Sequence, residues 1–165
     1  MSVKFSVQMN QKYMYDFFLY NTYTKITGIM TPILGVIALL MSIRTWITSG
    51  FTMAMPTMLI AVLFLVINPM TTKSSAKMQV KNTPMFQKPL EYELDGNGIT
   101  IRQDDAQALN KWDEIAKIVS TKKCVLVYMN RVRALVLPKE CMGEQYEAAI
   151  EIMRTHVPAK KMRIR

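Results

Sequence analysis

The stretch ITGIMTPILGVIALLMSI, residues 26–43, decides the fold because it contains no charged side chain. As a helix that rises 1.5 Å per residue it would measure roughly 27 Å, close to the hydrocarbon thickness of a bilayer. A second uncharged stretch follows over residues 45–69, with the apolar centre MLIAVLFLVI at 58–67. We therefore expect a transmembrane helical hairpin over 26–69, with spans at about 26–43 and 48–68 joined by RTWITSG.

The alternative is a pair of buried core helices in a soluble protein. The chain has only 165 residues, and those outside the two stretches are too few to cover both helices on all sides. A cleavable signal peptide is also disfavoured, because Asp16 and several aromatic residues precede the first stretch. Both helices are expected to remain in the mature protein.

The basic residues beside the two stretches predict the orientation of the hairpin. The connection between the spans contains only Arg44, whereas the outer flanks contain Lys4, Lys12, Lys25, Lys73, Lys77, Lys81 and Lys88. Loops rich in Lys and Arg stay in the cytoplasm. We therefore expect a two-span protein of the cell membrane with both termini cytoplasmic. Trp46 suits the outer interface.

The spans themselves contain no Asp, Glu, Lys, Arg or His, the residues that would line an ion or proton path. Transport is therefore poorly supported. Thr31 with Gly35, and Thr57 with Ala61, are small residues four apart that allow helices to approach closely. They are expected to close the hairpin on itself rather than to form a dimer face.

From Leu90 onward the hydrophobic pattern changes to the alternation that is typical of strands. A hairpin is expected around DGNG (95–98), and further strands over 106–112, 115–121, 124–129 and 132–137, the last two joined across Asn130 and Arg131. Apolar residues from Met142 to Met153 then recur at helical spacing and predict one amphipathic helix. The expected fold class is α+β, with an antiparallel curled sheet capped by one C-terminal helix.

The residues of this second half do not form a catalytic pattern. DGNG lacks the further ligands of a calcium loop, and adjacent acidic pairs such as Asp104 and Asp105 are typical of solvated turns. His156 is the single histidine, and the two cysteines, Cys124 and Cys141, are expected to be free thiols, the first in the core. No enzyme activity, metal site or cofactor is expected.

The formal net charge of +9 is consistent with nucleic acid, with anionic lipid or simply with membrane topology. Nucleic acid is disfavoured, because no binding module is recognisable. The strongest candidate for an interaction element is the basic tail, together with Lys139; its cations are Lys160, Lys161, Arg163 and Arg165. Such a tail either contacts an anionic leaflet or stays solvated and disordered.

The order of features resembles the YcxB-like family of small bacterial membrane proteins. The resemblance is carried by VKFSVQMNQKYMYDFFLYNTY (3–23), the two apolar stretches, YELDGNGITI (92–101), VLVYM (125–129) and VLPKE (136–140). It implies a bacterial pleckstrin-homology-like (PH-like) C-terminal domain, with a curled seven-stranded sheet and one helix. Where the family commonly has a basic group after the Pro-Lys pair, this chain has Glu140, which weakens the case for an anion site there.

The resemblance and the patterns together predict the organisation of the chain. It comprises an N-terminal strand and short amphipathic helix (1–25), the hairpin (26–69), a linker (70–89), the PH-like domain (90–157) and the basic tail (158–165). We also expect Val3–Gln8 to join the sheet as its missing strand. The expected core of the PH-like domain consists of Tyr92, Ile99, Trp112, Ile115, Leu126, Tyr128, Leu137, Pro138, Tyr146 and Ile150.

The expected function is that of a membrane-anchored, non-enzymatic binding or regulatory module. Its cytoplasmic domain would bind a protein partner, for example through an exposed sheet edge, or the inner leaflet of the membrane. The sequence is compatible with a homo-oligomer and does not decide the oligomeric state. A role in stress response or in immunity to a membrane-active peptide is one form of this hypothesis. The alternative, a small transporter or membrane-bound hydrolase, requires a buried charge or a convergent polar site that the sequence does not show.

Overall fold

The computed structural model describes residues 2–130 and 133–164, and the chain divides into two compact units. The hairpin unit comprises Phe18–Ala76, and the strand-rich unit comprises the residues up to Phe17 and those from Lys77 onward. The fold class is α+β, as expected. Helix α1 (Gln11–Tyr23) begins in the strand-rich unit and ends in the hairpin unit.

The hairpin unit is built from α2 (Ile26–Ser49) and from a second continuous helix formed by α3 (Phe51–Val62), the π-helical turn η1 (Leu63–Ile67) and the first part of α4 (Asn68–Asn82). The turn between them is Gly50 alone, whose φ of 85° suits glycine. The expected connection RTWITSG is therefore wrong, because Arg44–Ser49 are helical. Nothing in that stretch breaks a helix, and the Thr45 and Thr48 hydroxyls donate to carbonyls one turn earlier.

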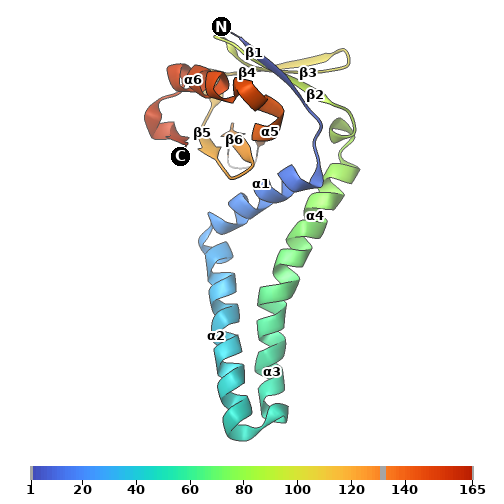
Figure 1. The fold of residues 1–165 in the computed structure, drawn as a ribbon, viewed down its shortest axis with the longest axis vertical. Helices are drawn as coiled ribbons and strands as arrows, with labels where there is room; N and C mark the ends of the chain where they lie inside the picture. The colour runs from blue at the N-terminus through green and yellow to red at the C-terminus, as the bar shows by residue number, and fades with distance from the viewer. Residues whose placement is uncertain (1, 131–132, 165) are drawn as a thin grey trace. The chain divides into compact units, whose positions relative to one another are not determined.

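Small residues allow the two helices of the hairpin to pack together side by side (Figure 1). A Cβ atom placed on Gly35 would lie 2.8 Å from Leu65 Cγ, so only glycine permits this approach. Ala54 and Ala61 are buried, and the buried Ser42 hydroxyl donates to Ala54 O at 3.3 Å. Of the four small residues predicted to close the hairpin on itself, Gly35 and Ala61 are buried at this contact, whereas Thr31 and Thr57 are half-buried.

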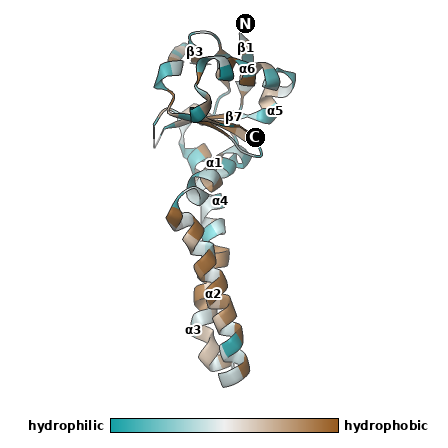
Figure 2. Cartoon of the chain, turned by 90° about the vertical axis from the view of Figure 1, so that its left-hand side faces the viewer, coloured by the Kyte–Doolittle hydropathy of each residue, from teal (hydrophilic) through white to brown (hydrophobic). Residues whose placement is uncertain are grey.

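Most other apolar side chains of the hairpin point outward. Figure 2 shows hydrophobic residues along α2 and α3, and the exposed fraction is 81% for Ile26, 62% for Leu40 and 64% for Leu59. Both helices are long and apolar enough to cross a membrane, by length and composition. The hairpin unit therefore has an apolar surface that it does not bury itself.

The strand-rich unit contains two four-stranded sheets. The first has the order β1-β2-β3-β4, all antiparallel, and comprises β1 (Val3–Val7), β2 (Leu90–Leu94), β3 (Gly98–Gln103) and β4 (Ala106–Lys111). Val3 pairs with Leu94 and Val7 with Leu90. The prediction that the N-terminal strand joins the sheet is confirmed.

The second sheet has the order β7-β6-β5-β8. It comprises β5 (Lys117–Ser120), β6 (Cys124–Tyr128), β7 (Ala134–Pro138) and the two-residue β8 (Met162–Arg163), which is parallel to β5. The expected single seven-stranded sheet is thus two sheets. The chain leaves the first sheet in a 3-10 turn, η3 (Trp112–Glu114), before β5 begins at Lys117 rather than Ile115. Arg131, expected in the β6–β7 turn, and Val132, expected as the first residue of the next strand, lie outside the described residues.

The C-terminal helix is interrupted, contrary to the prediction of one helix. A short α5 (Lys139–Met142) is followed by a 3-10 turn, η4 (Gly143–Gln145), and by α6 (Tyr146–His156). Gly143 has a φ of 51°, which ends α5. The buried face of α6 consists of Ala149, Ile150, Ile152 and Met153.

The segments expected as linker and tail are also structured. Residues 70–82 continue α4, and a 3-10 turn, η2 (Pro84–Phe86), leads to β2. In the tail, a 3-10 turn η5 (Ala159–Lys161) precedes β8.

The core of the strand-rich unit contains the expected residues with one exception. Tyr92, Ile99, Trp112, Ile115, Leu126, Tyr128, Leu137, Pro138 and Ile150 are buried. Tyr146 is only half-buried, because it lies in the first turn of α6 with the Lys139 ammonium 5.5 Å from its ring centroid. All five residues of β6 are buried, as is typical of a strand that is covered on both faces.

Candidate functional site

The best candidate for a functional site is the outer edge of β4, which pairs with β3 alone among the described strands. Its register runs without interruption from Gly98 opposite Lys111 to Gln103 opposite Ala106. The two-residue turn Asp104–Asp105 closes this hairpin, with Asp104 at a φ of 51°. Every residue of β4 except Asn110 is exposed.

The hydrogen-bonding direction along β4 follows from the neighbouring hairpin. Asp95 N–H donates to Gly98 O at 3.1 Å, so Gly98 directs its backbone N–H and C=O groups to β2. The direction repeats at every second residue of a strand, so Thr100 and Arg102 also direct their backbone groups to β2. In an antiparallel ladder the alternate residues of β3 then bond to β4. Their partners in β4 are Ala106, Ala108 and Asn110. It follows that Gln107, Leu109 and Lys111 direct their backbone N–H and C=O groups to the open edge.

The side chains of the same three residues lie on the outer face of the sheet. Gln107 is opposite Arg102, and Leu109, which is 47% exposed, is opposite Thr100. On the inner face, the buried Asn110 donates from Nδ2 to Ile99 O at 3.3 Å and accepts from Arg133 Nη2 at 3.4 Å. Asn110 thus fixes β4 in the fold, and the outward groups are left for a partner.

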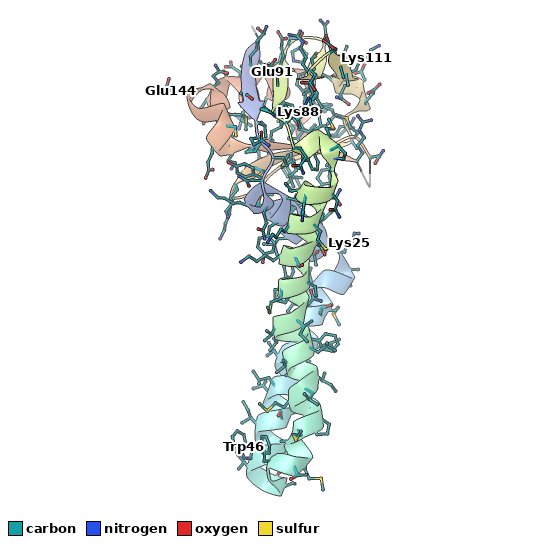
Figure 3. The ribbon with its side chains drawn as sticks, turned by 90° about the vertical axis from the view of Figure 1, so that its right-hand side faces the viewer. Lys25, Trp46, Lys88, Glu91, Lys111 and Glu144 are labelled. Carbon is teal, nitrogen blue, oxygen red and sulfur yellow. The ribbon has the colours of Figure 1, made fainter. Side chains whose placement is uncertain are left out.

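The two ends of β4 have opposite charges. Asp104 and Asp105 stand at the turn, and Lys111 ends the strand at the margin of the strand-rich unit (Figure 3). Asp104 forms an ion pair with Lys88 at 2.5 Å. Within residues 2–130 and 133–164, neither Asp105 nor Lys111 has an ion-pair partner.

A shallow depression of about 270 Å³ lies on the outer face of the same sheet. Glu93 stands in it between Lys4 and Arg102, at 3.0 Å from each. Because the cations of this depression are already paired with Glu93, it does not offer a charge for an anionic ligand. The edge of β4 is the better candidate.

The basic residues singled out from the sequence are not gathered into one site. Lys161 donates from Nζ to Ile115 O at 2.8 Å, so it helps to hold the tail against the fold. Lys160 and Arg163 are exposed, Lys139 lies over the Tyr146 ring, and Arg165 lies outside the described residues. A disordered tail is therefore wrong for residues 159–163, and one of its four cations is already used by the fold.

Sequence reasoning missed a polar cluster that joins α1 to α5. Glu140 accepts hydrogen bonds from Lys12 Nζ at 2.5 Å and from the Tyr13 hydroxyl at 2.8 Å. These two bonds lower the pKa of the Glu140 carboxyl, while burial, with the bond to Glu140, raises the pKa of Tyr13. Nearby, Thr121 Oγ1 donates to Asp16. No sequence signal links residues that are 127 positions apart.

The prediction that Cys124 and Cys141 are free thiols, with Cys124 in the core, is confirmed. Cys124 is buried and Cys141 half-buried, both as free thiols, and burial raises the pKa of Cys124 to about 12. His156 is exposed at the end of α6, where its ring stacks on Trp112 at 5.3 Å between centroids. The part of the chain that the structure describes holds no group of three or more potential metal ligands.

Comparison with known proteins finds a family model that matches part of the chain. Residues 94–153, which contain β3 to β7 and most of α6, match the model of the YcxB-like protein family. The resemblance to that family is confirmed over these residues. No curated protein and no solved structure matches the chain.

Proposed function

We propose that this YcxB-like chain is a membrane-anchored, non-enzymatic binding module of the bacterial cell membrane. The hairpin unit is the anchor, and the strand-rich unit binds a protein segment that adds to the sheet as a strand along β4. The single observation that carries the binding role is the open edge of β4, with the outward backbone groups of Gln107, Leu109 and Lys111.

The exposed apolar surface of α2 and α3 supports the anchor. Large apolar side chains line both helices and are exposed, from Ile26 to Ile67. A soluble protein rarely leaves so large an apolar surface in water. In a bilayer the same side chains face lipid, and the backbone hydrogen bonds of both helices are satisfied within each helix.

The pairing of β1 with β2 supports the predicted topology. These strands flank the hairpin in the sequence and lie in the same sheet. A chain that leaves the sheet after β1 and returns to it as β2 must cross the membrane an even number of times. Together with the basic flanks, this argues for two spans with the strand-rich unit on the cytoplasmic side.

We also infer that the strand-rich unit is a PH-like domain. The expected seven strands are present as β1 to β7, and the helix that follows them is α6, although the strands divide between two sheets. This inference concerns the fold and assigns no ligand.

The test is site-specific photocrosslinking in native membranes. We expect a photoreactive residue at Gln107, on the open edge, to give a discrete adduct, and the same residue at the exposed Glu147 on α6 to give none. Substitution L109P should abolish the Gln107 adduct, because it removes an outward N–H while leaving the bonds between β3 and β4 intact. Equal adducts from both positions, or an adduct that survives L109P in a folded chain, would contradict the proposal.

A further inference from the structure

We propose that the strand added to β4 is β4 of a second copy of this chain. The two strands run antiparallel, with the two-fold axis between the two Ala108 residues. This inference rests on the proposed function, because it names the partner of the same edge.

The edge of β4 lacks the features by which sheets avoid such pairing. Natural edge strands are interrupted by proline, by bulges or by several charges, or they are very short. β4 is six residues long, pairs in unbroken register with β3, and contains Lys111 as its one charged residue. Gln107, Ala108 and Leu109 at its centre are exposed and uncharged.

The backbone directions fit a two-fold pairing centred on Ala108. In that register Gln107 of each copy lies opposite Leu109 of the other. Both residues direct their N–H and C=O groups to the open edge, so they form a hydrogen-bonded pair. The two Ala108 residues form the central non-hydrogen-bonded pair, in which Cα atoms approach to about 4.5 Å. Their methyl groups are small enough for this approach.

The charges at the ends of β4 complement each other in this register. Asp105 of each copy lies opposite Lys111 of the other, and neither residue has an ion-pair partner among those that the structure describes within one copy. A register centred one residue later, on Leu109, would place Lys111 opposite the uncharged Gln107, and the position opposite Asp105 would fall in the 3-10 turn η3, outside β4. Only the register on Ala108 sets opposite charges against each other, which is favourable in a strand pair, so it is preferred.

Anchoring in a membrane makes such a small contact sufficient. Two copies that share a membrane have a higher effective concentration than two copies in solution. The pairing of six-residue strands therefore does not have to provide the affinity of a soluble dimer.

The first experiment is disulfide crosslinking of the full chain in membranes. The variant A108C in a C141S background, which removes the half-buried thiol, should form a disulfide-linked dimer on mild oxidation, since Cα atoms of the non-hydrogen-bonded pair suit a disulfide. The matched control Q107C should form at least about tenfold less, because its two copies would lie more than about 7 Å apart. Equal crosslinking of the two variants, or none at A108C, would overturn the inference.

Charge exchange tests the register independently. In the A108C background, D105K or K111D alone places like charges opposite each other and should reduce the dimer several-fold. The double variant D105K/K111D restores opposite charges and should recover the dimer. If the dimer yield of the double variant fell by the product of the two single reductions, with no recovery, the proposed register would be wrong.

The outcomes separate this inference from the proposed function. If the Gln107 photoadduct has the mass of two copies, the binding role of the β4 edge and the self-pairing of β4 are both supported. If the adduct contains a different protein and A108C does not crosslink, β4 is a binding edge and the self-pairing is wrong. If Gln107 gives no adduct and A108C does not crosslink, both are wrong.

Discussion

Glu140 shows how a single side chain determines the environment of a helix far away in the sequence. Its carboxylate accepts from Lys12 and Tyr13 of α1, and it stands where the resemblance suggests a basic group. A basic side chain at this position would repel Lys12 and leave the buried Tyr13 hydroxyl without its acceptor. Glu140 is therefore a structural residue that holds the beginning of α1.

The lowered pKa of Glu140 predicts a specific acid sensitivity. Because the carboxylate is favoured in the folded state, its contribution is present above the ordinary carboxyl pKa and is lost as the pH falls through the lowered one. We expect the amide protection factors of residues 11–17, corrected for the intrinsic pH dependence of exchange, to fall in acid in the wild type, and to change less with pH in E140Q. The control is E144Q, in the next turn, which should behave as the wild type. Identical acid responses in E140Q and wild type would refute this role.

At the scale of elements, the β2–β3 hairpin requires glycine at position 98, and the sequence shows only part of the reason. The DGNG turn was predicted, and Asp95 Oδ1 does accept from the backbone N–H groups of Asn97 and Gly98. The role of Gly98 depends on β4: its φ is 156°, and a Cβ atom there would lie 2.3 Å from Asn110 O. Gly96 has no such neighbour, since the nearest atom is His156 Nε2 at 3.9 Å.

Substitution of the two glycines should therefore have different effects. We expect G98A to lower the free energy of unfolding by about 2 kcal/mol, the scale of a strained backbone position, and G96A to change it by much less. Chemical denaturation of the detergent-solubilised chain, followed by Trp112 fluorescence, measures both. If G96A lowered the free energy of unfolding as much as G98A does, the conformation of the turn and not the contact with Asn110 O would explain the loss of stability.

Elements with a local signal were predicted better than the contacts between them. Strand alternation located β2 to β7 to within about two residues, and the uncharged stretches located α2 and α3. The helical Arg44–Ser49 segment was missed because polarity was interpreted as a loop, although nothing in it disfavours helix. The division into two sheets, the β8 pairing and the role of Glu140 depend on residues that are distant in sequence, which a pattern in a single chain does not contain.

For the whole molecule, β1 makes the strand-rich unit dependent on both ends of the sequence. Val3, Phe5 and Val7 are buried, and Phe5 stacks on Tyr92 at 5.7 Å. A piece that begins after the hairpin lacks these side chains and those of Tyr13 and Met14. It also exposes the edge of β2.

We therefore expect residues 77–165 alone to lack cooperative unfolding, and addition of a peptide of residues 2–17 to restore it. Thermal unfolding followed by near-ultraviolet circular dichroism measures this. A control peptide with F5D, which places a charge on the buried face of β1, should fail to restore it. Cooperative unfolding of 77–165 without the peptide would show that β1 is dispensable.

The pairing of Val3 with Leu94 also sets an order of events during synthesis. The apolar strand Val3–Val7 leaves the ribosome before the hairpin, and its partner β2 emerges only after the entire hairpin has been translated. At ordinary rates of translation this delay is on the order of ten seconds, far longer than a strand pair needs to form. A nascent chain that stalls within the hairpin thus carries an unpaired apolar strand, the kind of segment that chaperones and proteases recognise.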